Sequence, residues 1–245
     1  MLSVQGLSKR FGGVKAVSEC SFSVEPNKIT ALIGPNGAGK STVFNLVSGV
    51  LSPDAGKIVF DGADITGFLP EAVSKKGIAR LFQKSSLFKN LSVRENLLLG
   101  LDSNDTGFVS NMVGRGSALL ALEKPVSDSL ALVGLKGIEN KSAGELSFGQ
   151  KRLVELSRTM LSPHKLLMLD EPVAGVNPKI RSEIAELLVE LRKKGETVLL
   201  IEHDMNFTLS VSDRVIVMDD GRVIAEGSPK EIRKNPMVLE AYLGE

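Results

Sequence analysis

The sequence predicts an α/β fold, with a mostly parallel sheet and an inserted helical region. Short apolar strand patterns alternate with helical patterns toward the C-terminal end, and a strand-to-helix pattern also occurs near the N-terminal end. This alternation is typical of parallel sheets covered by helices. The middle of the chain, from about Leu87 to Leu161, loses the strand patterns and gains leucine-rich helical ones. A chain of 245 residues is long enough for one or two domains with a large core.

The first third of the sequence predicts a series of short strands. These segments are rich in valine, isoleucine and phenylalanine, and turn residues such as Pro26-Asn27 and Asp61-Gly62 separate them. The predicted strands are Leu2–Gln5, Cys20–Val24, Ile29–Ile33 and Lys57–Phe60.

The middle and the last third predict the remaining elements. In the middle we expect helical stretches at Ser117–Leu122 and Ser127–Val133, and a polar loop at Gly107–Gly116. Asn177-Pro178 predicts the start of a later helix, because asparagine is a good cap and proline suits the first helical position. Gly195 predicts its end. The later predicted strands are Lys165–Leu169, Thr197–Ile201, Arg214–Met218 and Val223–Ala225, the last two as a hairpin, and a capping box at Ser228–Glu231 predicts a C-terminal helix.

Composition and charge exclude several classes of protein. The 30 basic and 29 acidic side chains give a net charge of +1, so we expect no nucleic-acid partner. The single cysteine, Cys20, excludes an intrachain disulfide and favours a reducing compartment. The longest stretch without a charged residue, Ser41–Pro53, has 13 residues, too few to span a bilayer. The N-terminus also lacks a signal-peptide pattern, so we expect a soluble, cytoplasmic protein that reaches a membrane only through a partner.

A phosphate-binding loop is predicted directly after the strand Ile29–Ile33. The next residues match the pattern G-x-x-x-x-G-K-[ST], in which small residues let backbone N–H groups close around a polyphosphate. A Cβ at Gly37 or Gly39 would hinder that approach. The lysine is expected to reach the β- and γ-phosphates, and the first hydroxyl to bind magnesium. The predicted nucleotide-binding residues are Gly34, Pro35, Asn36, Gly37, Ala38, Gly39, Lys40, Ser41 and Thr42. Nucleotide kinases, GTPases, recombinases and transporter motors share this loop.

Two acids follow the apolar run Leu166–Leu169, which suits a buried parallel strand. Asp170 can hold magnesium, and Glu171 can polarise a water molecule for attack on the γ-phosphate, worth about 10²–10⁴-fold in rate. His203 follows the next strand, where a γ-phosphate contact is possible, although a lone histidine is more often structural. His164 lies in a polar turn and is expected at the surface.

A further segment, Leu146-Ser147-Phe148-Gly149-Gln150, opens a predicted helix with its serine as the cap. It resembles the LSGGQ signature of the ABC ATPases. The order of motifs along the chain is also similar to that family: phosphate loop, a glutamine at Gln83, signature, the acidic pair Asp170-Glu171, and a histidine at His203. The resemblance covers nearly the whole chain.

The resemblance implies a P-loop ATPase fold of the ABC type, with an N-terminal antiparallel β-subdomain. The nucleotide-binding core would comprise residues 1–86 and 162–245, and residues 87–161 would form the helical subdomain. Two cassettes would sandwich two molecules of ATP with Mg²⁺. Catalysis would involve Glu171, His203, Gln83 and Lys40, the metal would be bound by Ser41, Gln83 and Asp170, and ATP would also contact Phe11 and, from the second subunit, Ser147, Gly149 and Gln150.

The most similar family members are the ATP-binding subunits of branched-chain amino acid uptake systems. The shared segments include FGGVKAV, IGPNGAGKSTVFNLVSG, DEPVAGVNP, IEHDM and AYLGE. The resemblance therefore implies the motor subunit of an importer, held at the inner face of the cell membrane by permease subunits and served indirectly by a solute-binding protein. The second ATPase subunit could be identical or different.

Other functions remain open at this point. An exporter-type ATPase such as one for lipopolysaccharide, or a urea or amide importer, would have similar motifs. Soluble ABC proteins of DNA repair are disfavoured, because about 100 residues between Thr42 and Leu146 leave no room for a long coiled coil. Soluble ABC proteins of translation usually carry two cassettes, whereas this chain has one. A nucleotide kinase would not need the signature.

Three features need the structure. Phe148 replaces a glycine of the signature, and Asn177 stands where many family members have aspartate. In the family, the segment after the glutamine, here Lys84–Glu95, receives the permease. Leu87 and Phe88 are candidate permease contacts, with burial inside the helical subdomain as the alternative.

Overall fold

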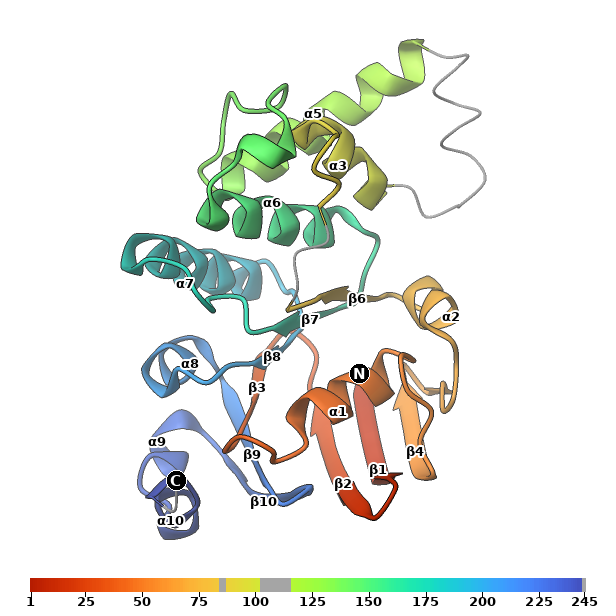
Figure 1. Cartoon of the computed structure of the whole chain (residues 1–245), viewed down its shortest axis with the longest axis vertical. Helices are drawn as coiled ribbons and strands as arrows, with labels where there is room; N and C mark the ends of the chain where they lie inside the picture. The colour runs from red at the N-terminus through yellow and green to blue at the C-terminus, as the bar shows by residue number, and fades with distance from the viewer. Residues whose placement is uncertain (84–86, 102–115, 244–245) are drawn as a thin grey trace.

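Two β-sheets organise the computed structural model, which describes residues 1–83, 87–101 and 116–243 (Figure 1). The larger sheet has the strand order β10-β9-β3-β8-β7-β6. All of its neighbouring strands pair in parallel except β10, which pairs antiparallel with β9. The strands are β3 Ile29–Ile33, β6 Ile78–Leu81, β7 Leu166–Asp170, β8 Val198–Ile201, β9 Arg214–Asp219 and β10 Arg222–Gly227. This sheet confirms the predicted mostly parallel α/β fold.

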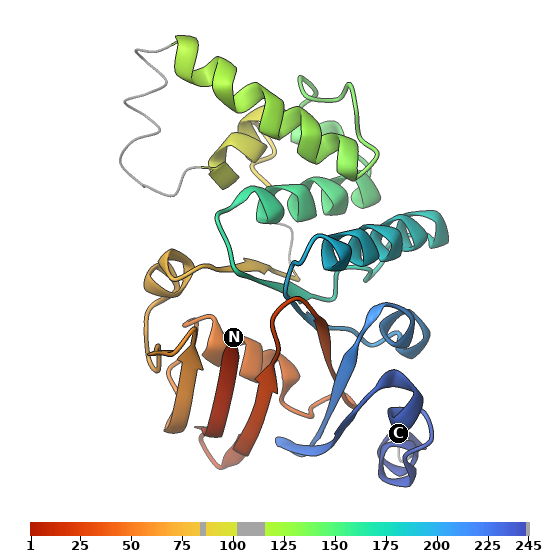
Figure 2. The same ribbon diagram turned by 180° about the vertical axis from the view of Figure 1, so that it is seen from behind.

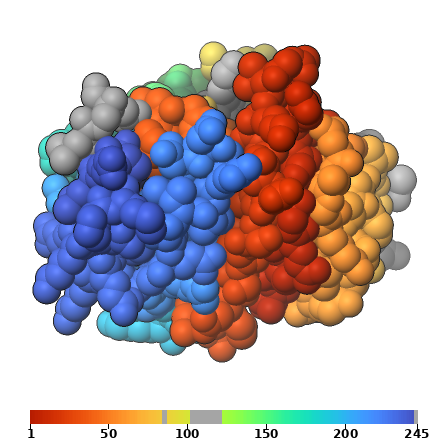
Figure 3. All heavy atoms as spheres, turned by 90° about the horizontal axis from the view of Figure 1, so that it is seen from below, coloured from red at the N-terminus to blue at the C-terminus, as the bar shows by residue number. Residues whose placement is uncertain are grey.

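The smaller sheet is antiparallel and has the order β2-β1-β4-β5. Its strands are β1 Leu2–Phe11, β2 Val14–Val24, β4 Ala55–Phe60 and β5 Ala63–Asp64. The first two are longer than predicted, because they continue until they meet at a tight turn where Phe11 pairs with Val14. Seen from below, these N-terminal strands (red) lie beside the C-terminal segments (blue), and the Ser18 N–H donates to the Gly221 carbonyl at 2.9 Å (Figure 3).

Alternating side chains of the parallel sheet build two cores. On β7, Leu166 and Met168 pack with the antiparallel sheet and with α1 (Lys40–Val47), whereas Leu167 and Leu169 pack with the helices of the opposite face. The period of two along a strand explains why an unbroken apolar run is needed there. In Figures 1 and 2, α1 and α6 therefore lie on opposite sides of this sheet.

The helical part of the chain lies over the second core. Its elements are α3 Val93–Leu101, α5 Gly116–Leu132, the short 3₁₀ helix Ala143–Glu145 and α6 Phe148–Leu161. Both expected helical stretches lie in α5, which is one continuous helix that runs through Pro125 and ends at Leu132. The loop expected at Gly107–Gly116 lies outside the described residues, except for Gly116, which begins α5.

Two of the remaining helices begin where local capping chemistry predicts. Asn177 accepts a hydrogen bond from the Ile180 N–H at 2.9 Å and caps α7. Ser228 forms the predicted capping box with Glu231. The expected C-terminal helix is two short helices, α9 and α10, since proline at 236 starts a new one. The bounds are α2 Pro70–Lys75, α7 Pro178–Lys193, α8 Met205–Val211, α9 Pro229–Ile232 and α10 Pro236–Leu243. Among the described residues, none of these helices combines the length and hydrophobicity that crossing a membrane requires.

Candidate functional site

The phosphate loop joins the end of β3 to the start of α1. A Cβ on Gly34 would lie 2.0 Å from the Met218 carbonyl oxygen, and a Cβ on Gly39 would lie 2.3 Å from that of Ala16. Both glycines are therefore required by the packing of neighbouring backbone, a reason additional to the predicted approach of a phosphate. Gly37, with φ of +82°, has no atom within 4 Å of its Cβ position, so the loop is open there.

Lys40 is the first residue of α1, and its ammonium is held inside the loop. The Nζ donates hydrogen bonds to the carbonyl oxygens of Gly34 and Pro35, each at 2.7 Å. Ser41 is exposed and Thr42 is half-buried at the same helix end. The backbone N–H groups and the dipole of a helix N-terminus favour an anion at this position.

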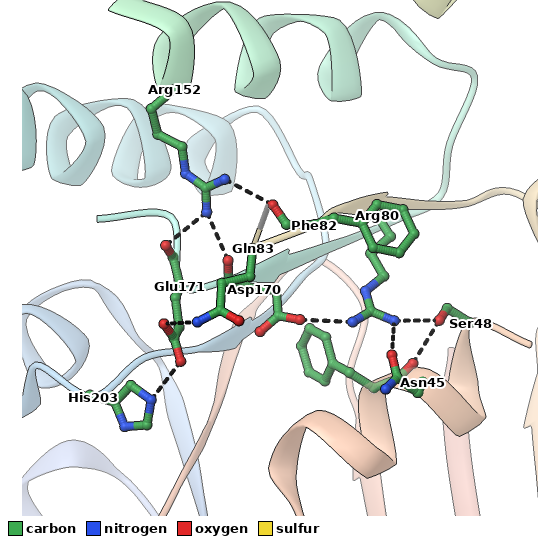
Figure 4. Close-up of polar contacts among 10 residues, drawn as sticks. Asn45, Ser48, Arg80, Phe82, Gln83, Arg152, Asp170, Glu171 and His203 are labelled. Atoms are coloured by element: carbon green, nitrogen blue, oxygen red, sulfur yellow. Dashed lines mark hydrogen bonds and ion pairs between the residues drawn. The ribbon is translucent and has the colours of Figure 1, made fainter. Parts of the chain in front are cut away.

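The acidic pair lies at the carboxyl end of β7, beside the ends of β6 and β8. The Glu171 side chain is largely buried, and its two carboxylate oxygens have different partners. Gln83 Nε2 donates to one oxygen at 2.7 Å, and His203 Nε2 contacts the other at 2.5 Å (Figure 4). The structure thus brings together three residues that the sequence places far apart.

This arrangement orients a carboxylate for proton transfer. The imidazole of His203 donates to this carboxylate oxygen when its Nε2 carries the proton. Glu171 also has a φ of +49°, a left-handed conformation that is rare for a residue with a side chain. Such strain is often found at functional sites, where the surrounding structure holds it in place. A carboxylate fixed from two sides in this way can serve as a general base.

A second buried carboxyl group, that of Glu202, lies behind the acidic pair. Burial raises the pKa of Glu202 above its usual value, and the charge of Glu171 adds to the rise. The hydrogen bonds from the N–H groups of Val173 (2.9 Å) and His203 (3.2 Å) oppose it. Through these two hydrogen bonds, the Glu202 carboxylate connects the backbone of Val173, two residues after Glu171, to the backbone of His203.

The residues predicted to bind magnesium offer oxygen atoms of the kind this ion prefers. Asp170 provides a carboxylate, Ser41 a hydroxyl and Gln83 an amide oxygen, since its nitrogen bonds to Glu171. In the part of the chain that the structure describes, no cluster of three or more His, Cys, Asp or Glu forms a metal cage. Mg²⁺ usually takes one or two carboxylates, together with phosphate and water oxygens.

The signature segment begins α6 as predicted. Ser147 accepts a hydrogen bond from the Gln150 N–H, and the Gln150 side chain accepts from the Ser147 N–H, which completes a capping box. Ser147 is exposed, and Gly149 is half-buried against Ile180 of α7. Since α6 and α1 lie on opposite sides of the parallel sheet, the structure does not bring the signature to the phosphate loop of the same chain (Figure 1).

The two departures from the family pattern have clear local environments. The Phe148 ring is 60% exposed and lies over Gly175, where an added Cβ would be 3.2 Å from the ring. Asn177 caps α7, a role that asparagine and aspartate fill about equally well. Phe11, the predicted adenine contact, ends β1 with an exposed ring, and the Lys9 ammonium lies 5.8 Å from the ring centroid.

Sequence reasoning missed two buried arginines beside the site (Figure 4). Arg80 of β6 forms an ion pair with Asp170 at 2.7 Å. Arg152 of α6 donates to the carbonyl oxygens of Asp170 and Glu171, each at 2.8 Å. For Arg80, the available signal was a cation inside the apolar strand pattern Ile78–Leu81. For Arg152, it was a cation on the apolar face of a predicted helix.

Two other expectations are decided by burial. His164 is not a surface residue: its side chain is largely covered, and its ring contacts the Ser162 carbonyl at 2.6 Å and Glu196 at 3.1 Å. Leu87 is buried in the core of the helical part, whereas Phe88 is 57% exposed, so only Phe88 can make the predicted external contact. Residues 84–86 of the expected permease segment lie outside the described residues.

Comparisons with known proteins agree with this geometry. The ABC transporter family model matches residues 17–174, and a model for the branched-chain amino acid ATP-binding cassette transporter matches residues 222–245. The chain is 42% identical to the high-affinity branched-chain amino acid transport ATP-binding protein BraF of Pseudomonas aeruginosa, and 40% identical to LivG of Escherichia coli. Both alignments cover 100% of this chain and 98% of the relative.

Solved structures give the same result. A nucleotide-free ATP-binding cassette from an ABC transporter has a TM-score of 0.85 and 36% identity, covering 100% of this chain and 99% of the other. A cassette in its ADP conformation has a TM-score of 0.84 and 35% identity, with the same coverage. The family match over more than half of the sequence and the full-length relatives show that this chain belongs to the ABC transporter family, as an ATP-binding cassette.

Proposed function

We propose that this chain is the ATP-hydrolysing subunit of an importer for branched-chain amino acids. The observation that carries the proposal is the Glu171 carboxylate, which Gln83 and His203 hold at the edge of the sheet next to the phosphate loop. The cargo follows from BraF and LivG, which are named for branched-chain amino acid transport and align over the full chain.

The chain's residues would divide the work of binding ATP with Mg²⁺. The exposed Phe11 ring would stack on the adenine, and residues 34–42 would surround the phosphates. Lys40 would exchange its carbonyl contacts for the β- and γ-phosphates. The bound metal would neutralise charge on the phosphates, with Ser41, Gln83 and Asp170 providing ligands.

Glu171 would take the proton from the attacking water molecule. The hydrogen bond from Gln83 fixes one carboxylate oxygen, and the imidazole of His203 fixes the other. His203 is half-exposed, so it could turn toward the γ-phosphate while its backbone stays anchored to Glu202. General-base catalysis of this kind is worth about 10²–10⁴-fold.

The site would be completed by a second ABC cassette. The start of α6, with exposed Ser147 and half-buried Gly149 and Gln150, lies on the far side of the sheet from its own phosphate loop. It can therefore serve the ATP of another subunit, in an isologous dimer if the two subunits are identical. Loss of the γ-phosphate would remove a contact between the two halves, and the dimer would open.

Permease subunits would hold the protein at the inner face of the cell membrane. Phe88 gives an exposed aromatic contact next to the Gln83 segment, at the start of the helical subdomain proposed for residues 87–161. Through this contact, changes at the nucleotide would reach the permease. A solute-binding protein would deliver the amino acid on the other side.

The decisive variant is Glu171→Gln, which keeps the size and shape of the side chain but removes the base. We expect ATP binding to persist, turnover to fall by about 10²-fold or more, and a dimer to accumulate with ATP on size-exclusion chromatography. Turnover near that of the wild type would contradict the role of Glu171.

Ser147→Arg tests the second half of the site and serves as the matched variant. It should abolish turnover and leave the ATP affinity of the monomer intact, because its own phosphate loop is unchanged. A loss of ATP affinity in the monomer would contradict the proposal that Ser147 acts on the ATP of the second subunit.

The cargo needs a test of its own. Deletion of the gene should lower cellular uptake of labelled leucine, and unchanged uptake would contradict the proposed transport of branched-chain amino acids.

A further inference from the structure

Arg80 is a buried cation that no step of the proposed mechanism uses. Its side chain is 7% exposed and comes from β6, three residues before Gln83. One guanidinium nitrogen donates to Asp170 Oδ2 at 2.7 Å. The other donates to Asn45 Oδ1 at 2.8 Å and to Ser48 Oγ at 2.7 Å, both at the end of α1 (Figure 4).

Arg80 points into a core layer that is built mostly from apolar side chains. Its neighbours Ala79 and Leu81 face the helical part, so Arg80 and Ile78 face the core that contains α1. The rings of Phe44 and Phe82 lie 5.6 Å and 4.6 Å from the guanidinium carbon. Contacts of a cation with aromatic faces are favourable and restrict the side chain to one position.

Stability alone is a poor explanation for this buried pair. Removing a guanidinium and a carboxylate from water costs free energy that their attraction often fails to recover, and apolar residues of similar volume are frequently as stable. The Arg80 Nε is also buried, with no hydrogen-bond partner among the described residues. An arginine at this position gives something that an apolar residue cannot, namely a fixed place for one carboxylate oxygen.

The contacts tie the predicted metal ligand to the helix of the phosphate loop. Arg80 has a rigid, planar fork, so the Asp170 oxygen on one arm is set relative to Asn45 and Ser48 on the other. The same α1 carries another predicted magnesium ligand, Ser41, at its opposite end. With Oδ2 held by the arginine, Asp170 keeps Oδ1 for the metal.

We propose that Arg80 is a positioning residue that sets Asp170 for the magnesium ion of the bound nucleotide. This inference rests on the proposed function, since it concerns the same ATP site. The groups that orient a metal ligand typically change metal affinity by about 10–100-fold when removed. The opposing possibility is that the positive charge of Arg80 merely weakens the attraction between Asp170 and the ion.

The test measures the binding of a fluorescent ATP analogue with Mg²⁺ and with EDTA. The ratio of the Kd in EDTA to the Kd in Mg²⁺ is the magnesium gain. In Arg80→Met, the Kd in EDTA should stay unchanged, because the phosphate loop is intact, and the magnesium gain should fall about 10-fold. The matched control, Lys75→Met, removes a cation from an exposed ion pair on α2, and should keep the gain.

Two further variants separate positioning from charge and guard against misfolding. Asn45→Ala with Ser48→Ala keeps the charge and the ion pair with Asp170 but frees the fork from α1, so the magnesium gain should also fall. Arg80→Lys keeps the charge and loses the fork, with the same expected direction. Circular dichroism establishes that each variant is folded, and these two carry the test if Arg80→Met is not.

The outcomes are distinct. A fall in the gain for the folded variants supports the inference. A gain that is unchanged, or that rises in Arg80→Met, overturns it while the proposed function survives. Wild-type protein that does not bind the analogue would instead contradict the proposed function, and the inference with it.

Discussion

Replacing Arg152 by alanine should strongly destabilise the protein. The buried guanidinium donates to four backbone carbonyl oxygens, those of Phe82, Asp170, Glu171 and Pro172, at 2.8–3.1 Å. Each buried acceptor left without a donor costs about 1–3 kcal/mol, although such costs do not add fully. The variant also removes one partner of the buried Glu155 carboxylate, at 3.4 Å, and breaking a buried pair costs about 3–5 kcal/mol.

We therefore expect the free energy of unfolding to fall by about 3–5 kcal/mol. In a protein of this size each kcal/mol lowers the Tm by about 2–4 °C, so the Tm should fall by about 6–20 °C. Urea denaturation followed by circular dichroism measures the first quantity, and calorimetry the second. Lys151→Ala is the matched control on the same helix, because its ammonium makes one exposed contact at 3.2 Å. A loss in Arg152→Ala of less than about 1 kcal/mol, or no larger than in the control, would refute the reasoning.

The remaining predictions concern two buried titratable groups. The pKa of Glu202 is raised above 4.5, so the native state binds more protons than the unfolded state just above that pH. The contribution of Glu202 to the free energy of unfolding should fall as pH rises through that window, so the stability difference between Glu202→Gln and the wild type should shift in favour of the variant; a pH-independent difference between their denaturation curves would contradict this. Burial raises the pKa of Cys20 to about 12, so iodoacetamide should label the native protein far more slowly than the urea-unfolded chain, and equal rates would count against it.

Local sequence chemistry determined where many elements begin. The strand Ile29–Ile33 has the predicted bounds, and α1 starts at the lysine of the phosphate loop. Ser147, Asn177 and Ser228 each cap a helix as predicted. These outcomes depend on hydrogen bonds within a few residues, so the sequence of one segment is enough to predict them.

The sequence was less informative where an element depends on distant packing. The two expected helical stretches around Pro125 form a single helix, since neighbours on α3 and α6 pack against it and hold it together. The side chain of His164 is largely buried, and its ring contacts Glu196, 32 residues later in the sequence. Neither outcome has a signal in the local pattern.

The candidate site shows the same division. Motif order alone predicted that Gln83, Glu171 and His203 belong to one site, and the sheet brings their side chains together because parallel strands end at one edge. The contacts of the two buried arginines could not be predicted in this way. A cation within an apolar pattern does not reveal which face of the sheet or helix it occupies or what it contacts, and Arg80 contacts a carboxylate 90 residues later in the sequence.

By itself, the sequence determined the fold class, the phosphate loop, the signature and the family of this chain. Only the tertiary structure decided what supports the acidic pair: Arg80, Arg152 and Glu202. The physical reason is that a buried charge is stable only where several partners from separate segments satisfy it. Those partners become neighbours only once the chain has folded.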